Sequence, residues 1–219
     1  LKEMQKFYLE ENVSIEKDKR FSSFKNINIK NIAFNYKNSS DTTLKNLSFQ
    51  IKRGEKIGIT GPSGSGKTTL IHILLGLIKQ SSGEIKIDDE ILAKNNLTQW
   101  QKLLGFVPQS VFLTSKSIKE NIAFGVEKDQ IDKNKIKKLI DFSQLTEIVS
   151  TLPEKENSKI GERGIKLSGG QQQRVGIARA FYPDPKIVFF DEATNSLDVL
   201  TENEIMNSLN NLDKDITVI

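Results

Sequence analysis

The first regular pattern in the chain is an alternation of apolar and polar residues near its N-terminal end. It covers residues 29–36 and again residues 44–51, and a run of Asn, Ser and Asp lies between them at residues 38–41. A period of two residues is typical of half-buried strands, and turn-forming residues between two such stretches are typical of a hairpin. The pattern therefore predicts an antiparallel hairpin.

Beyond residue 55, short apolar runs alternate with stretches of helical periodicity. The spacing of Leu70, Ile73, Leu74 and Leu77 predicts a helix over residues 69–78. The other patterns predict strands at residues 56–60, 83–88, 104–107, 186–190 and 216–219, and helices at residues 117–123, 133–142 and 171–181. Strands at both ends thus enclose a helix-rich middle, which favours an α/β fold with a parallel sheet.

The expected domain boundaries follow from the polarity of the N-terminal segment. Residues 1–20 are polar and charged, so we expect a linker or the end of a preceding helix there, and one domain over residues 21–219. Because the chain begins with Leu rather than Met, we expect a piece of a longer protein. The longest uninterrupted aliphatic or aromatic run covers only residues 187–190, so no transmembrane segment is predicted.

Composition places the chain among ordinary globular domains. Of its 219 residues, 37% are hydrophobic, 27% are charged and none is Cys. The lack of Cys excludes disulfide frameworks, Cys-zinc sites and thiol nucleophiles. The net charge is +4, but the basic residues are 27 Lys and only 5 Arg. Because Arg is the better residue for bidentate recognition of phosphates and bases, we interpret the excess charge as solubilising surface and expect no nucleic-acid partner.

Residues 61–68 read Gly-Pro-Ser-Gly-Ser-Gly-Lys-Thr and fit the phosphate-loop pattern G-x-x-x-x-G-K-[ST]. A predicted strand precedes this loop and a predicted helix follows it, which is the required context. Glycines let backbone N–H groups approach phosphate oxygens, Lys67 places a charge on the β- and γ-phosphates, and Thr68 offers a hydroxyl to Mg²⁺. The candidate nucleotide-binding residues are Gly61, Pro62, Ser63, Gly64, Ser65, Gly66, Lys67, Thr68 and Thr69.

An acidic pair, Asp191 and Glu192, directly follows the apolar run at residues 187–190. In open α/β sheets, ligands bind at the carboxyl ends of the strands, so Asp191 is expected beside the phosphate loop as a second ligand of Mg²⁺. Glu192 is placed to polarise the water that attacks the γ-phosphate. Alone, such a pair is often a helix cap, but beside a phosphate loop we favour the metal and base roles.

A second possible anion site lies at residues 168–171, where Ser168, Gly169, Gly170 and Gln171 precede an amphipathic helix. Ser is a natural N-cap, and the glycines leave backbone amides bare. Taken alone, an ordinary capped helix is the better interpretation. The string at residues 167–174, however, closely resembles the signature sequence of ABC-type ATPases. With the phosphate loop and the acidic pair in order, the chain is identified as resembling the nucleotide-binding domain of an ABC transporter from about residue 24 onward.

The resemblance implies a P-loop NTPase (RecA-like) core with a parallel sheet, an N-terminal antiparallel β subdomain and a helical subdomain at about residues 110–180. It further implies that Tyr36 stacks on adenine and that Gln109 touches Mg²⁺ and water and senses the membrane part. Asp198 lies in a D-loop-like segment and would act across a dimer. Residues 161–164 and 120–125 resemble exporter-type sequences, so we expect an exporter or flippase.

The mechanism that the resemblance implies needs ATP, Mg²⁺ and two partners. A second nucleotide-binding domain would pair head to tail, so that residues 168–171 cap a triphosphate held by the other copy. A transmembrane domain would carry the substrate, which places the chain on the cytoplasmic side of the cell's inner membrane. The implied catalytic residues are Glu192, Lys67 and Gln109, and the implied metal ligands are Thr68, Gln109 and Asp191.

One family feature is missing from the chain. The family carries a histidine after the strand that begins at residue 216, and this sequence ends at residue 219. The one histidine present, His72, is wrongly placed for that role, and we expect it in helix packing or on the surface. We therefore expect a chain that lacks the C-terminal part of the domain and binds ATP better than it hydrolyses it.

Other functional classes fit the residues less well. A soluble ABC ATPase of translation or DNA repair usually carries two cassettes or a long coiled-coil insertion, and neither is visible here. A GTPase should contain an Asn-Lys-x-Asp guanine-binding motif, which is absent, and a small-molecule kinase would not need the signature sequence. Glu192 argues against a non-hydrolysing regulatory cassette. The residues do not indicate which substrate is transported.

Overall fold

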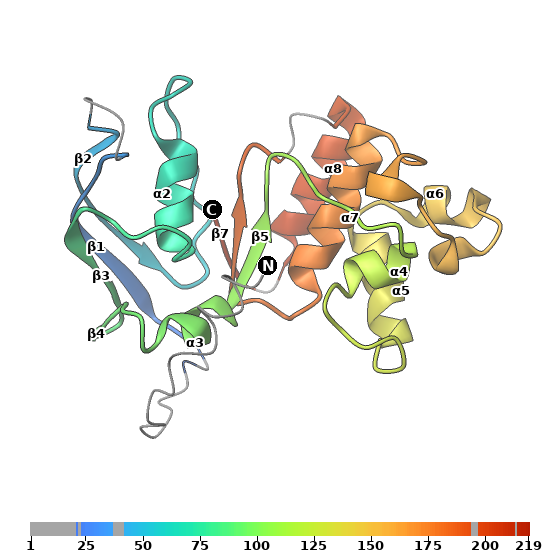
Figure 1. Cartoon of the computed structure of the whole chain (residues 1–219), viewed down its shortest axis with the longest axis horizontal. Coiled ribbons are helices and arrows are strands. Elements are labelled where there is room, and N and C mark those ends of the chain that lie inside the picture. The colour runs from blue at the N-terminus through green and yellow to red at the C-terminus, as the bar shows by residue number, and fades with distance from the viewer. Residues whose placement is uncertain (1–20, 22, 37–41, 194–196, 213) are drawn as a thin grey trace, which may run out of the picture.

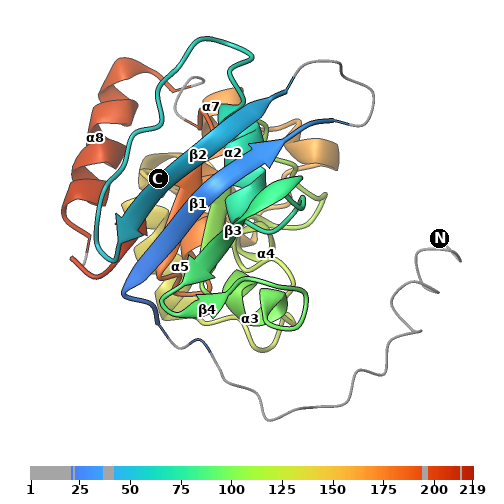
Figure 2. The same cartoon turned by 90° about the vertical axis from the view of Figure 1, so that its left-hand side faces the viewer.

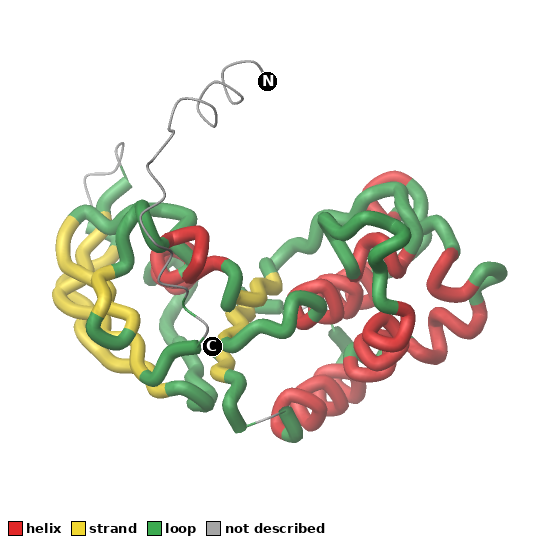
Figure 3. The backbone as a smooth tube through the Cα atoms, turned by 90° about the horizontal axis from the view of Figure 1, so that it is seen from below, coloured by secondary structure: helices red, strands yellow, loops and turns green. Residues whose placement is uncertain are grey.

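The structure is a computed structural model that describes residues 21, 23–36, 42–193, 197–212 and 214–219. Most strands gather at one end of the molecule and most helices at the other (Figure 3). The predicted linker at residues 1–20 and the predicted turn at residues 38–41 lie outside the described residues. The α/β class expected from the sequence is confirmed, because a parallel sheet, an antiparallel sheet and a group of helices are all present.

The antiparallel sheet contains the predicted hairpin. It consists of β1 (Asn26–Phe34), β2 (Leu44–Lys52), β3 (Ser82–Ile87) and β4 (Glu90–Ile91), in the order β2-β1-β3-β4. Ile27 of β1 pairs with Ile51 of β2 on one side and with Ile87 of β3 on the other. All three side chains are at most 1% exposed, so the apolar face of the sheet is turned into the core. Figure 2 shows this sheet in front of α2 (Lys67–Leu74).

The parallel sheet consists of β5 (Leu104–Val107), β6 (Ile187–Phe190) and β7 (Thr217–Val218), in that order. Helix α2 lies between the two sheets (Figure 1), and its Ile73 shares a core with Ile27 and Phe189. The strand predicted at residues 56–60 is wrong in extent, because only a single bridge pairs Lys56 with Val218. The apolar pattern at these positions comes from side chains that pack on the core without continuing the sheet.

The helix-rich middle of the chain forms a group with its own apolar core. It comprises α4 (Ile118–Ile122), α5 (Lys133–Phe142), α6 (Thr146–Thr151) and α7 (Gly169–Phe181), with short 3-10 turns at Lys155–Asn157 and Glu162–Gly164. Residues of all four helices contribute buried side chains to one cluster, including Ile118, Ile136, Val149 and Val175. Helix α7 also contacts β5, so it joins the helical group to the parallel sheet.

Two helices outside this group were not predicted from the sequence. Helix α3 (Leu97–Gln101) is held by Trp100, which is 1% exposed and donates a hydrogen bond from Nε1 to the backbone oxygen of Leu74 at 2.8 Å. Helix α8 (Val199–Asn210) packs through Ile205 and Leu209 on a third core cluster, which includes side chains of α7 and β6. No helix in the described part of the chain has both the length and the apolar character needed to cross a membrane.

The close contact between β5 and α7 generates a prediction about stability. A Cβ atom at Gly105 would lie 2.5 Å from the backbone oxygen of Ala180, which cannot move without shifting α7. We expect Gly105→Ala to lower the free energy of unfolding by about 1–3 kcal/mol, measured by urea denaturation. Gly58→Ala is the matched control, because a Cβ atom there meets nothing within 4 Å. Equal stability of the two variants would contradict the proposed contact.

Candidate functional site

The phosphate loop is shaped by glycines that adopt positive φ angles. Gly64 has φ 77° and Gly66 has φ 93°, and Gly66 is the N-cap of α2 without any side-chain cap. A side chain at Gly66 is excluded for a second reason, because its Cβ would lie 2.7 Å from Cδ2 of Leu44 and 3.1 Å from the oxygen of Thr43. The loop therefore turns directly into α2, and the uncapped N–H groups at the start of the helix attract anions.

Lys67 extends back over the loop that precedes it. Its Nζ donates hydrogen bonds to the backbone oxygens of Gly61 at 3.1 Å and Pro62 at 3.2 Å. The same Nζ lies 3.8 Å from Oε1 of Glu192. The ammonium group is thus positioned at the mouth of the loop, between backbone oxygens on one side and a carboxylate on the other. A cation at this place suits the β- and γ-phosphates of a nucleotide.

Thr68 and Asp191 meet although they are 123 positions apart in the sequence. The hydroxyl of Thr68 donates to Oδ1 of Asp191 at 2.9 Å, and the Asp191 residue is 5% exposed. The N–H of Asp191 donates to the backbone oxygen of Val107 at 3.0 Å, which fixes Asp191 at the carboxyl end of the parallel sheet. The structure therefore brings together the hydroxyl and the carboxylate that the sequence pattern predicts as neighbours.

These two oxygen groups fit a magnesium ion that is shared with a nucleotide. Mg²⁺ prefers hard oxygen ligands and is usually held by one or two carboxylates together with substrate phosphates. Within the described residues, no group of three or more His, Cys, Asp or Glu side chains could hold a metal ion without a substrate. The donor set of one hydroxyl and one carboxylate thus matches an ion that arrives with its phosphates.

Glu192 and Gln109 form the opposite side of the same site. Nε2 of Gln109 donates to Oε2 of Glu192 at 2.9 Å. Glu192 has φ 50°, a left-handed conformation that costs a non-glycine residue on the order of 1–3 kcal/mol. A cavity of about 180 Å³ lies here, lined by Lys67, Asp191, Glu192 and neighbouring apolar residues. The two consecutive carboxylates have different partners, because Asp191 accepts from Thr68 and Glu192 accepts from Gln109.

Tyr36 lies close to the start of α2. Its hydroxyl shares a hydrogen bond of 3.0 Å with Oγ1 of Thr69, and 48% of the residue is exposed. Its ring packs edge-on against Phe34 with a centroid distance of 4.8 Å. The structure thus places this aromatic residue beside the phosphate loop, where a nucleotide base could reach it.

The segment at residues 168–171 is a capped helix start. Gln171 donates its N–H to Oγ of Ser168 at 3.3 Å, and Ser168 donates its N–H to Oε1 of Gln171 at 3.0 Å, so the pair is a capping box. Gly169 is exposed and Gly170 is partly buried. In the described part of the chain, no hydrogen bond or ion pair joins this segment to the phosphate loop. The structure therefore does not bring the two candidate anion sites of one chain together.

Asp198 is the N-cap of α8. It accepts hydrogen bonds from the N–H of Thr201 at 3.0 Å and from the hydroxyl of Thr201 at 2.8 Å. These bonds stabilise the carboxylate and hold the pKa of Asp198 below its ordinary value. Ser196, two positions before Asp198 in the D-loop-like segment, lies outside the described residues. His72 packs edge-on against Phe106, as expected for a helix-packing residue.

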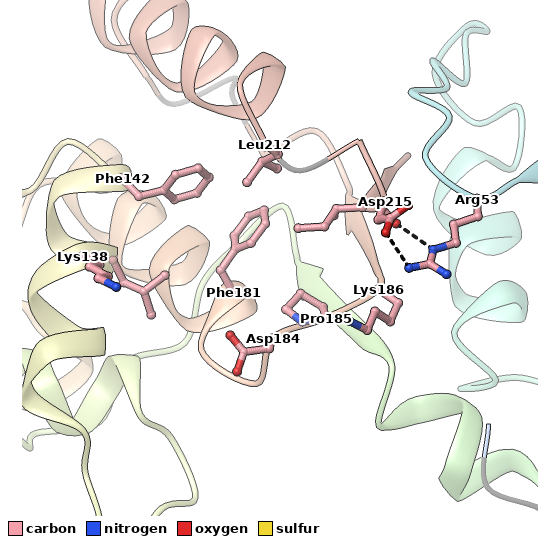
Figure 4. A pocket seen from close by; sticks show the side chains of 11 residues that line it. Arg53, Lys138, Phe142, Phe181, Asp184, Pro185, Lys186, Leu212 and Asp215 are labelled. Carbon is pink, nitrogen blue, oxygen red and sulfur yellow. Dashed lines mark hydrogen bonds and ion pairs between the residues drawn. The ribbon is translucent and has the colours of Figure 1, made fainter. Parts of the chain in front are cut away.

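A larger cavity of about 410 Å³ lies away from all of these motifs (Figure 4). Its lining includes an edge-to-face pair of Phe142 and Phe181, and the pair Arg53 and Asp215, whose charged atoms are 2.9 Å apart. None of the predicted site residues lines it. The smaller cavity is therefore the candidate site, because it is the one to which the phosphate loop and the acidic pair contribute.

Three residues with hydrogen bonds to the segment that follows β5 were missed by reasoning from the sequence. Gln173 donates from α7 to the backbone oxygen of Pro108 at 3.0 Å, and Arg179 donates from the same helix to the oxygen of Phe112 at 2.8 Å. Asn121 is fully buried, and its Oδ1 accepts from the N–H of Thr114 at 2.9 Å. Gln173 and Asn121 lie within segments that resemble family motifs. Only the folded structure shows which backbone groups their side chains bind.

Comparison with known proteins places these motifs in one family. The family model described as "ABC transporter" matches residues 44–195, which is more than half of the chain. The chain is 35% identical to a "Multidrug resistance ABC transporter ATP-binding and permease protein" of Lactococcus lactis subsp. lactis (strain IL1403), over 89% of this chain and 33% of that protein. It is 40% identical to an "ATP-dependent lipid A-core flippase" of Coxiella burnetii (strain RSA 493 / Nine Mile phase I), over 85% and 31%.

A solved structure of a bacterial Atm1-family ABC exporter with ATP bound has the same fold. Its TM-score is 0.85 at 30% sequence identity, and the match covers 100% of this chain and 38% of the exporter chain. The chain spans about a third of the length of the curated relatives it matches. The similarity therefore concerns the ATP-binding part of these proteins.

The cap of α8 generates a prediction about proton binding. Since the pKa of Asp198 is lowered in the folded chain, this carboxylate contributes stability above its unfolded pKa, and the contribution is lost as pH falls through the folded pKa. Thr201→Val removes the hydroxyl but keeps the backbone donor. We expect it to raise the pKa of Asp198 part of the way toward the ordinary value, measured by NMR titration of the side-chain carboxyl. An unchanged pKa would show that the Thr201 hydroxyl does not influence the proton affinity of Asp198. Thr146→Val is the control and should leave the pKa of Asp198 unchanged.

Proposed function

The chain belongs to the ABC transporter family as an ATP-binding domain of the exporter and flippase type, and we propose that it holds Mg-ATP between its phosphate loop, Asp191 and Glu192. Domains of this family hydrolyse ATP to power transport. The observation that carries the proposal is the meeting of Thr68 with Asp191 at 2.9 Å across 123 positions of sequence, with Lys67 and Glu192 beside them.

The binding half of the site uses groups that the loop already presents. Backbone N–H groups at the start of α2 and the ammonium group of Lys67 contact phosphate oxygens, and Tyr36 stacks on the base. Thr68 and Asp191 hold Mg²⁺ together with the phosphates, and Gln109 joins them through its side-chain oxygen. When bound, the ion draws electron density from the β- and γ-phosphates and offsets the charge that develops during transfer.

The hydrolytic half of the site is Glu192, with Gln109 as its neighbour. The Glu192 carboxylate accepts a hydrogen bond from a water molecule and orients it in line with the γ-phosphorus. The bond from the water oxygen to phosphorus forms as the bond to the β–γ bridging oxygen breaks, and the water proton passes to the carboxylate. Gln109 supports this geometry because it already donates to the other oxygen of Glu192 at 2.9 Å.

A second copy of the domain completes each site in this proposal. Ser168, Gly169, Gly170 and Gln171 present a helix start that makes no bond to the phosphate loop of its own chain within the described residues. In a head-to-tail pair, this start would contact the γ-phosphate held by the partner copy, and Asp198 would lie near the junction. A single chain would then bind ATP better than it hydrolyses it, because it supplies only half of the contacts around the γ-phosphate.

The whole protein is proposed to be an exporter or flippase that is anchored by a transmembrane domain. The relatives are described as ATP-binding and permease proteins or flippases, and this chain corresponds to about a third of their length. The exporter-like stretch at residues 120–125 includes Asn121, which holds the loop after β5. In that arrangement the domain would work on the cytoplasmic side of the inner membrane.

Replacement of the loop lysine tests nucleotide binding. We expect Lys67→Ala, in the full-length protein, to weaken ATP binding roughly 10- to 100-fold, because a charge-assisted hydrogen bond is lost. Isothermal titration calorimetry would measure the change. Lys56→Ala is the matched control, because Nζ of Lys56 also donates to a backbone oxygen, that of Asn210, at 3.1 Å but outside the loop. Equal affinity of the two variants would remove Lys67 from the phosphate site.

Replacement of the candidate base tests hydrolysis. We expect Glu192→Gln to lower kcat by roughly 10²–10⁴-fold with ATP affinity retained, because the amide keeps the shape but cannot accept the proton. Phosphate release and nucleotide affinity are measured separately in the full-length protein. Glu202→Gln, at a partly exposed position of α8, serves as the control and should leave turnover unchanged. Wild-type turnover in Glu192→Gln would exclude Glu192 as the base.

A further inference from the structure

A buried side chain joins the first turns of α7 to the segment that follows β5. Gln173 is 2% exposed, and its Nε2 donates a hydrogen bond to the backbone oxygen of Pro108 at 3.0 Å. The next residue, Gln109, donates from its own side chain to Glu192 at 2.9 Å. Only one peptide unit therefore separates the contact of Gln173 from the residue that touches the proposed base.

Two more contacts from the same face of α7 hold the same segment. A Cβ atom at Gly176 would lie 2.4 Å from Cγ2 of Val111, so the helix backbone packs directly on that side chain. One turn further along, Nη1 of Arg179 donates to the backbone oxygen of Phe112 at 2.8 Å. Because Gln173, Gly176 and Arg179 are spaced three residues apart, they lie along one side of the helix. The segment after β5 is therefore fastened to α7 along its length.

On its other side, this segment is anchored to the parallel sheet. The backbone oxygen of Val107 accepts from the N–H of Asp191 at 3.0 Å, and Val107 pairs with Phe190 in the sheet register. The backbone at Val107 and Pro108 is thus held on one side by the hydrogen bond from Asp191 and on the other by the hydrogen bond from Gln173 of α7. A shift of α7 at Gln173 must either stretch the bond to Pro108 or move the backbone that carries Gln109.

We infer that Gln173 is a positioning residue for hydrolysis. It couples the position of α7 to the position of Gln109, and Gln109 in turn orients Glu192. The inference rests on the proposed function, because it assigns Gln109 and Glu192 their roles in the reaction. Helix α7 begins at the capping box of Ser168, the segment proposed to contact the triphosphate of a second copy. Gln173 then links the anion-binding start of α7 to the chemistry of the site in its own chain.

A role confined to packing predicts different kinetics from a positioning role. Loss of packing destabilises the fold and lowers every activity regardless of what stands at position 109. Loss of positioning lowers turnover only while Gln109 is present to be positioned, because the effect passes through that side chain. A double-mutant cycle between positions 173 and 109 separates the two cases.

The experiment measures ATP hydrolysis by the full-length protein with radiolabelled ATP, so that slow variants remain measurable. We expect Gln173→Met to lower kcat roughly five- to tenfold, the size of one lost hydrogen bond, with the KM for ATP changed less than twofold. In a Gln109→Ala background, the same substitution should change kcat less than twofold. The matched control is Gln101→Met, because Nε2 of Gln101 also donates to a backbone oxygen, that of Leu75, but at the C-cap of α2.

Each outcome decides the inference. An equal loss of kcat in both backgrounds, or wild-type kcat in Gln173→Met, overturns it. If Gln173→Met does not fold, Gln173→Leu replaces it, because its shorter apolar side chain also lacks the donor and introduces no charge into the buried position, and the same comparison applies. Absence of ATP hydrolysis in the wild type would instead reject the proposed function, whereas hydrolysis that is lost in Lys67→Ala but unaffected in Gln173→Met rejects the role of Gln173 alone.

Discussion

The arrangement of the site depends on the parallel pairing of β5 with β6. In this register Val107 pairs with Phe190, so both strands end at the same edge of the sheet, and the N–H of Asp191 donates to the backbone oxygen of Val107 at 3.0 Å. Gln109 and Glu192 are then each two residues beyond a paired position, which allows their side chains to meet. A shift of one residue would turn every side chain of β6 to the opposite face and separate these groups.

Local patterns in the sequence predict those parts of the site that consist of consecutive residues. The phosphate loop, the buried strand before Asp191 and the cap at Ser168 were predicted in this way, and the structure contains all three. Helix α3 was missed, and it is held by the tertiary hydrogen bond of Trp100 to Leu74, which spans 26 positions. The contact of Gln173 with Pro108 spans 65 positions, and no local pattern encodes it.

Buried polar groups fix the position of the helical group on the sheet. Burial lowers the pKa of the Arg179 guanidinium, but an arginine stays charged in proteins, so it needs compensating partners. It donates to the backbone oxygens of Asn121 and Phe112, each at 2.8 Å, and lies 5.1 Å from the ring of Phe124. Such contacts add modest net stability but have steep costs when broken, so they select one arrangement of the loop after β5.

In the proposed dimer, helix α7 contributes to two different nucleotide sites. Its start at Ser168 would contact the triphosphate of the partner copy, whereas its side at Gln173 holds the backbone next to Gln109 in its own chain. A rigid helix transmits a displacement of one end to the other, and α7 has 13 residues with only one turn between Ser168 and Gln173. In the proposed dimer, binding at one site would therefore change the geometry at the other, so the packing of α7 would make the two sites interdependent without any additional element.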